Sequence, residues 1–103
     1  MSNRLDLQAK FEEILGSRNV YFNPPASVLM QYPAIRYELK DFRTKSANNS
    51  TMYISNTGYE CVLIMKEPAD DMLLNRIRGI PYCKFGRHYK ADNLNHYTFT
   101  IYQ

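Results

Sequence analysis

Residues 34–42, AIRYELKDF, alternate between apolar and charged side chains, and this alternation constrains the fold more than any other stretch of the chain. Ile35, Tyr37 and Leu39 fall on one side of an extended backbone, and the charged residues between them fall on the other. Such a pattern is typical of a strand with one buried and one solvated face. The sequence therefore predicts a sheet that is covered on only one side.

Two further segments have the spacing of amphipathic helices, which would supply that cover. In residues 2–17 the apolar positions recur with helical spacing at Leu7, Phe11, Ile14 and Leu15, and Gly16 supplies the left-handed stop. In residues 67–79 the predicted cap is Asp70 or Asp71, the buried side is Leu73, Leu74 and Ile77, and Gly79 ends the helix.

The remaining extended segments complete the fold prediction. They are residues 19–22, 58–66, 80–92 and 94–103, and the apolar run in 58–66 predicts a strand buried on both faces. A chain of 103 residues is long enough for one domain. We therefore predict an α+β fold over residues 1–103, a single small domain with a mostly antiparallel sheet flanked by two helices, in the order α-β-β-β-α-β-β.

Two segments show neither the alternation of a strand nor the apolar spacing of a helix. Residues 23–33 contain adjacent prolines and predict an ordered loop, which Leu29, Met30 and Tyr32 would attach to the body. Residues 43–57 are rich in Ser, Asn and Thr, and predict a long loop or a hairpin arm. Loops of this length in compact domains are usually functional or disordered.

Charge and cysteine usage narrow the class of protein. The net charge of +3 is low for a dedicated nucleic-acid binder of this size. Cys61 and Cys83 form no C-x-x-C pair, so we expect reduced core cysteines in a protein made in a cytoplasm. The N-terminus shows no signal-peptide pattern, and the longest apolar run, CVLIM, is too short to cross a membrane.

The only two histidines, His88 and His96, flank Asp92 and raise the question of a metal or acid–base site. They would approach each other if the last two strands placed them on the same face, and the set would then resemble a three-ligand metal site. Asp92 falls in the predicted turn, where Asp commonly bonds its own backbone. We expect strand-packing histidines, no metal, no cofactor and no catalytic residues, because no nucleophile elbow, phosphate loop or metalloprotease motif is present.

A basic stretch between Arg76 and Lys90 contains no acidic residue and is interleaved with aromatic residues. One interpretation is a solvated strand face above ordinary apolar residues. The other is a positive patch that meets an acidic partner or the phosphates of DNA, with Lys84, Arg87 and Lys90 as its candidate residues.

Two longer stretches, NVYFNPPASVLMQYPAIRYEL and IPYCKFGRHYKADNLNHYTFTIY, resemble a known family. The family consists of small neck proteins encoded among the head–tail joining genes of long-tailed phages and prophages. Its members carry a YF-x-PP segment, a YP-x-I-x-Y strand and a C-x-F-x-R-H-x-x-A-D-N-L-N-H ending. The resemblance covers residues from about 4 to 103 and is weakest at 44–56.

Within that family, the predicted element order resembles the tail terminators rather than the mainly helical adaptors or the β-barrel stoppers. The resemblance implies a non-enzymatic virion protein that forms a hexameric ring at the head-proximal end of the tail tube, stops tube polymerisation and offers a surface for head joining. The alternatives are another neck component, such as a head-completion stopper or joining protein, and, more distantly, a small DNA-binding regulator.

The resemblance also implies partners and a location. The partners would be other copies of the chain, the tail tube protein, the head connector or stopper, and DNA passing through the lumen without sequence-specific binding, with no membrane. The location would be the virion neck after synthesis in the bacterial host cytoplasm. The candidate residues for the ring or tube interface are Arg43, Lys45, Asn48, Asn49, Met52 and Tyr53, and the candidate pore residues are Lys84, Arg87 and Lys90.

Overall fold

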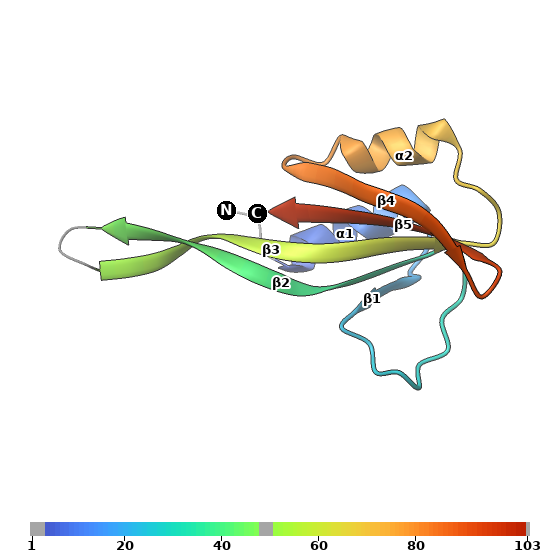
Figure 1. Cartoon of the computed structure of the whole chain (residues 1–103), viewed down its shortest axis with the longest axis horizontal. Helices are drawn as coiled ribbons and strands as arrows, with labels where there is room; N and C mark the ends of the chain where they lie inside the picture. The colour runs from blue at the N-terminus through green and yellow to red at the C-terminus, as the bar shows by residue number, and fades with distance from the viewer. Residues whose placement is uncertain (1–3, 48–50, 103) are drawn as a thin grey trace.

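The computed structural model describes the backbone of residues 4–47 and 51–102, and their side chains except those of residues 42–56. The elements are α1 (Arg4–Leu15), β1 (Val20–Phe22), β2 (Ala34–Ala47), β3 (Thr51–Met65), α2 (Asp71–Arg78), β4 (Cys83–Ala91) and β5 (Leu94–Tyr102). This order confirms the predicted α+β fold of type α-β-β-β-α-β-β (Figure 1).

The five strands form one sheet in the order β1-β2-β3-β5-β4. β1 runs parallel to β2, and the other neighbouring strands are antiparallel. β3 therefore lies at the centre, between β2 and β5, which agrees with its predicted burial on both faces. Four successive residues of β3 are buried: Cys61, Val62, Leu63 and Ile64.

β2 and β3 continue past the other strands as a hairpin arm (Figure 1). The backbone register runs from Ala34 opposite Ile64 to Ala47 opposite Thr51, with irregularities after Leu39 and after Arg43. The sequence predicted either a long loop or a hairpin arm for residues 43–57. The described backbone of this segment consists of two paired strands, as in a hairpin arm. The side chains of the candidate interface residues in the arm lie outside the described residues.

α1 covers one face of the sheet with the apolar stripe that the sequence predicts. Leu7, Phe11 and Ile14 are buried, and the helix stops before Gly16, whose φ of 71° suits a residue without a Cβ. α2 begins at the predicted cap, because an Asp70 carboxylate oxygen accepts a hydrogen bond from the Leu73 backbone N–H at 2.8 Å.

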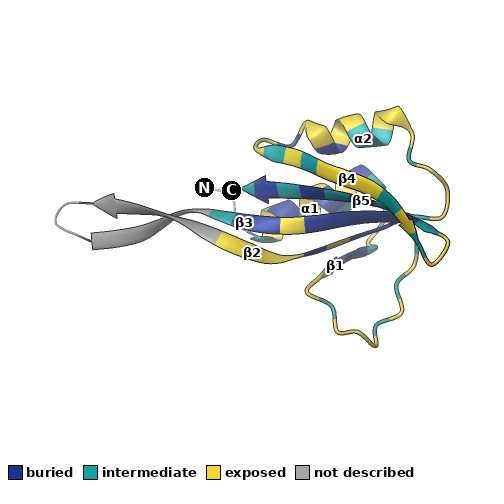
Figure 2. Ribbon diagram, viewed as in Figure 1, coloured by how far each residue is buried: buried dark blue, intermediate teal, exposed yellow. Residues whose placement is uncertain are grey.

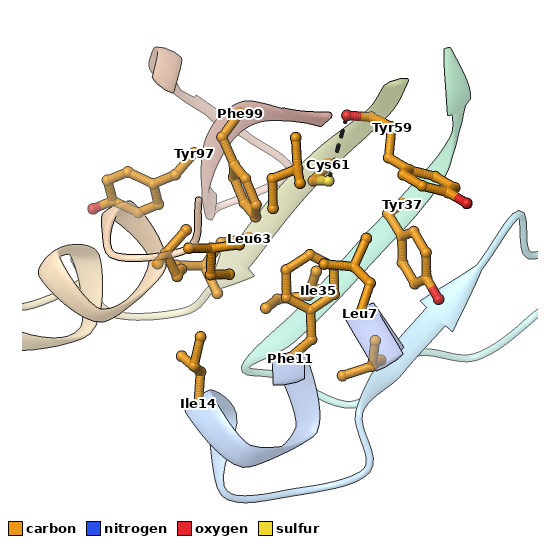
Figure 3. Packing of buried hydrophobic residues seen from close by; sticks show 14 residues of the cluster. Leu7, Phe11, Ile14, Ile35, Tyr37, Tyr59, Cys61, Leu63, Tyr97 and Phe99 are labelled. Atoms are coloured by element: carbon orange, nitrogen blue, oxygen red, sulfur yellow. Dashed lines mark hydrogen bonds between the residues drawn. The ribbon is translucent and has the colours of Figure 1, made fainter. Parts of the chain in front are cut away.

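The core lies between the two helices and one face of the sheet, which we call the helix face (Figure 3). Fully buried Phe11 of α1 meets Tyr37 of β2 and Phe99 of β5 edge-on, with ring centroids 5.3 and 6.0 Å apart. Ile77 brings α2 into the same cluster. The alternation in β2 thus places Ile35 and Tyr37 against the helices, whereas Val62 and Ile64 of the central strand are buried on the opposite face.

Two predictions about apolar residues are wrong. Leu29 does not attach the loop of residues 23–33 to the body, because its side chain is 91% exposed. The Tyr21 hydroxyl holds this loop instead, by accepting a hydrogen bond from the Gln31 backbone N–H at 3.2 Å. Leu39 was expected inside with Ile35, but it is 46% exposed at the position where the β2 register becomes irregular.

Candidate functional site

The closing hairpin of β4 and β5 carries both histidines, and its turn fixes their approximate positions. Ala91 pairs with Leu94, so the turn has two residues, Asp92 and Asn93. Both have positive φ, 53° and 61°, as a type I′ hairpin turn requires. Asp92 therefore serves the turn conformation, as the sequence predicted.

A β-bulge in β4 decides which face each histidine occupies. Phe85 pairs with Phe99 and His88 pairs with Tyr97, so Gly86 and Arg87 together oppose Thr98. The Thr98 hydroxyl occupies this site: it accepts from the Arg87 backbone N–H at 2.8 Å and donates to the Arg87 carbonyl at 3.2 Å. The side chain of Thr98 thus replaces the ladder bonds that the bulge interrupts.

The bulge separates the two histidines. Without the extra residue, counting on from the Phe85–Phe99 pair would set His88 directly opposite His96. In the structure His88 stacks on Tyr97 on the helix face, with ring centroids 4.4 Å apart. His96 stacks on Tyr89 on the opposite face, at 4.8 Å. One metal ion cannot bridge two imidazoles on opposite faces of a sheet, so a site shared by the two histidines is excluded.

Each histidine instead has a structural partner. The His88 Nε2–H donates to the Asn95 side-chain oxygen at 3.0 Å, and the Asn95 amide donates to the Lys66 carbonyl at 3.3 Å. Asn95 is buried, at 6% exposure, which sequence reasoning missed. The His96 Nδ1–H donates to the Leu94 carbonyl at 3.0 Å. Within the described residues, no group of three or more His, Cys, Asp or Glu side chains is arranged to hold a metal.

The face of the sheet opposite the helices, which we call the open face, carries a row of polar side chains across four strands. By register, Glu38 of β2 pairs with Glu60 of β3, Glu60 with Thr100 of β5, and Thr100 with Lys84 of β4. The three charged members of this row are exposed. Figure 2 shows exposed positions on each of the strands that carry them, β2, β3 and β4. We call this set the charged row. Its acidic end lies on β2 and β3, and its basic end lies on β4.

The two carboxylates of the charged row stand directly opposite each other. Cross-strand neighbours have Cβ atoms about 5 Å apart, and like charges at that distance are destabilising. Among the described residues, none forms a hydrogen bond or an ion pair with Glu38 or Glu60. Both carboxylates are therefore available to a cation from outside the chain.

Beside the charged row, the open face is hollowed into a depression of about 590 Å³. Its lining residues are Arg36, Tyr37, Glu38, Glu60, Val62, Gly86, Arg87, Tyr89 and Thr98. The Arg87 guanidinium lies over the Tyr89 ring, 4.6 Å from its centroid. This stacking holds the guanidinium on the open face and leaves its hydrogen-bond donors free for a carboxylate.

The structure does not bring the three predicted basic residues onto one surface. Lys84, opposite Thr100, and Arg87, against Tyr89, lie on the open face. Lys90 pairs with Asn95 and therefore lies on the helix side of the sheet. The bulge again causes the difference, because it changes which residues of β4 face each side.

The sheet has two free edges within the described backbone. β4 is the last strand on one side. On the other side, β1 flanks β2 only from Ile35 to Tyr37, so β2 itself is the edge from Glu38 onward. Unpaired strand edges invite association with another chain. The basic end of the charged row lies at one edge and its acidic end at the other.

The cysteines are free thiols on the helix face. Cys61 pairs with Phe99 and Cys83 with Ile101, so β5 separates them. Burial raises the pKa of the Cys61 thiol well above its ordinary value and raises the pKa of the Cys83 thiol to about 11. Raised thiol pKa values disfavour the thiolate, which is the nucleophilic form.

Comparison with known proteins adds no family assignment, because neither a scan against protein-family models nor a search of curated protein sequences found a match. No helix in the described part of the chain has both the length and the apolar character needed to cross a membrane. The functional conclusion therefore depends on the fold, on its arm and on its free sheet edges.

Proposed function

We propose that this chain is a structural subunit of a phage neck, a tail terminator that forms a ring at the head-proximal end of the tail tube. The observation that carries the proposal is the fold itself: an α-β-β-β-α-β-β domain whose central hairpin extends beyond the sheet as an arm. This order is the one that the family resemblance implied.

The proposed mechanism is mechanical. Identical copies associate head to tail until rotation closes the ring, which requires two different and complementary edges on each copy. The free β4 edge and the free part of β2 are candidates for those edges. One side of the ring binds the last ring of the tube and stops its growth, and the other side offers a different surface to the head connector or stopper.

The arm is the candidate contact with the tube or a neighbouring subunit. Its sequence from residue 42 to residue 59 contains Arg43 and Lys45 and no acidic residue. Together with Asn48, Asn49, Met52 and Tyr53, these two are the proposed interface residues. A hairpin that projects from the body can add strands or side chains to another subunit without rearranging the core.

DNA would pass through the lumen of such a ring without sequence-specific contacts. Of the three basic candidates, Lys84 and Arg87 lie on the same face and can act together, whereas Lys90 lies on the other. The proposed location is the virion neck, after synthesis in the bacterial host cytoplasm.

Deletion of the gene from a phage or prophage that carries it tests the proposal. A terminator mutant releases tails of overlong or irregular length, and a plasmid copy of the gene restores uniform tails. Electron microscopy of the lysate measures this distribution. Free tails of normal length beside filled heads would contradict the terminator role and indicate another neck component, such as a stopper.

A DNA-binding role is the second candidate, because the cation–π pair of Arg87 and Tyr89 lies near Lys84 on an open sheet. Aromatic and basic side chains on such a face suit a nucleic-acid strand. The carboxylates of Glu38 and Glu60 on the same face oppose phosphates. Salt-dependent DNA binding by the isolated chain would favour this candidate, and absence of binding at low salt would remove it.

A further inference from the structure

We propose that copies of this chain associate through the two ends of the charged row, with Lys84 and Arg87 on the β4 edge of one copy facing Glu38 and Glu60 beside the β2 edge of the next. The inference rests on the proposed ring function and names the residues that join its subunits. The partner is a second copy, and the recognition is between guanidinium or ammonium groups and a pair of carboxylates.

Charge complementarity between the two edges is the first argument. Glu38 and Glu60 form a like-charge cross-strand pair, and no described residue forms a hydrogen bond or an ion pair with either carboxylate, although the Arg36 side chain lines the same depression. A cation brought by a neighbour would relieve that repulsion. The opposite edge presents such cations on the same face of the sheet, in Lys84 and in the Arg87 guanidinium held over Tyr89.

The position of these residues along the strands is the second argument. Glu38, Glu60, Thr100 and Lys84 are successive register partners, so they lie at one level across the sheet. With strands about 4.8 Å apart, the two ends of the row are separated by roughly 14 Å. When the basic end of one copy meets the acidic end of the next copy at this level, the second copy is related to the first by a rotation about the strand direction. It is not displaced along that direction.

That geometry distinguishes a ring from a filament. A head-to-tail contact with no axial displacement closes on itself when the rotation divides a full turn, whereas a displaced contact generates a helix. The two ends also lie at different edges, so the contact joins different surfaces. The edge positions therefore favour a head-to-tail contact over a two-fold dimer, in which both copies would use the same surface.

Charge reversal at each end tests the proposal. Lys84→Glu/Arg87→Glu makes both edges acidic, and Glu38→Lys/Glu60→Lys makes both edges basic, so neither variant should self-associate. In a one-to-one mixture, the acidic edges of one variant can contact the basic edges of the other. Every contact is then complementary when the two variants alternate. The mixture should therefore assemble, and so should the chain that carries all four reversals.

Matched controls separate specific pairing from net charge. Lys10→Glu/Arg76→Glu and Glu13→Lys/Glu67→Lys change the net charge equally, and these residues lie on the two helices or in the connection before α2. Both controls should assemble like the wild type. All four target side chains are exposed, so the reversals leave the core intact, and circular dichroism verifies the fold of each variant.

Sedimentation velocity at low ionic strength measures the outcome, since the Debye length reaches about 30 Å at 0.01 M salt. The expected result is assembly of the wild type, loss in each double variant, recovery in the mixture and loss of all assembly at high salt. A wild type that stays monomeric under these conditions, or double variants that assemble normally, would overturn the inference. If the charge-reversed variants assemble like the wild type, the terminator proposal still stands, because tail length in the deletion lysate tests that proposal separately.

Discussion

His88 and His96 lie on opposite faces of the sheet, although a regular ladder from Phe85–Phe99 would pair them directly. The bulge at Gly86 and Arg87 moves His88 opposite Tyr97, where it stacks and donates to Asn95. A pattern that resembles a metal site in sequence therefore becomes two separate packing contacts. The local backbone decides the chemistry available to the hairpin.

The first prediction concerns metal binding. Because the two imidazoles face opposite sides, zinc added to the purified chain should not bind with a one-to-one stoichiometry that depends on both histidines. Isothermal titration of the wild type, His88→Ala and His96→Ala measures this. A stoichiometric zinc site lost in both variants would show that the hairpin register is wrong.

The second prediction concerns Gly86. A Cβ built there would lie 2.6 Å from the Thr98 hydroxyl oxygen, which two hydrogen bonds to Arg87 hold in place. Gly86→Ala should therefore destabilise the fold by about 1–3 kcal/mol, the usual cost of overpacking. Urea unfolding measures the change in free energy of unfolding.

Gly79→Ala is the matched control for that measurement. Gly79 has a φ of −72°, and its added Cβ would lie 3.4 Å from the nearest heavy atom, the Arg76 carbonyl oxygen. This variant should be neutral or slightly more stable, because it restricts the unfolded chain. Equal costs at the two glycines would argue against the bulge as the cause.

The third prediction concerns the like-charge pair of Glu38 and Glu60. Glu60→Lys converts it into an opposite-charge cross-strand pair, so the isolated chain should gain about 0.2–1 kcal/mol in unfolding free energy at low salt. High salt should reduce the gain. Thermal unfolding at two salt concentrations measures it, with Glu67→Lys as the control for net charge.

If the charged row joins neighbouring copies, Glu60→Lys should also weaken self-association while it stabilises the monomer. Opposite effects on stability and on assembly are typical of a residue retained for an interface. A variant that loses stability in the monomer would contradict the cross-strand pairing of the two carboxylates.

The fourth prediction concerns alkaline pH. Burial raises the pKa of the Cys83 thiol from 9.0 to about 11, and burial raises the pKa of the Tyr37 hydroxyl above 10.0. Between pH 9 and 11 the unfolded chain releases protons that the folded chain keeps. The unfolding free energy should therefore be constant below this range and fall as the pH rises through it.

Chemical unfolding at several pH values, with a reductant present, measures that decline. Cys83→Ala removes one of the titrating groups, so its decline should be smaller than that of the wild type. A wild-type stability that is unchanged or higher at the upper end of the range would contradict the burial of these groups.

The sequence predicted the elements and their order because the signals are local. The alternation at Ile35 and Tyr37, the stripe at Leu7 and Phe11, and the Asp70 cap each depend on residues within a few positions of one another. Leu29 shows the limit of this reasoning. An apolar residue in a loop is buried only if another element reaches it, and none of the described elements does.

The candidate surface was less predictable, since it depends on pairing between distant strands. Nothing local indicates that Glu38 faces Glu60, or that both share a level with Lys84. The bulge that puts Lys84 and Lys90 on opposite faces was also missed. Gly86 within a strand pattern was its one available signal, because such glycines often mark bulges.

Direct imaging of tail tubes with this chain tests the central claim most closely. Tubes polymerised from the matching tail tube protein, with and without the purified chain, are compared by electron microscopy. The account predicts a ring of density at one end of each tube and shorter, uniform tubes when the chain is present. Identical length distributions, with no density at either end, would contradict it.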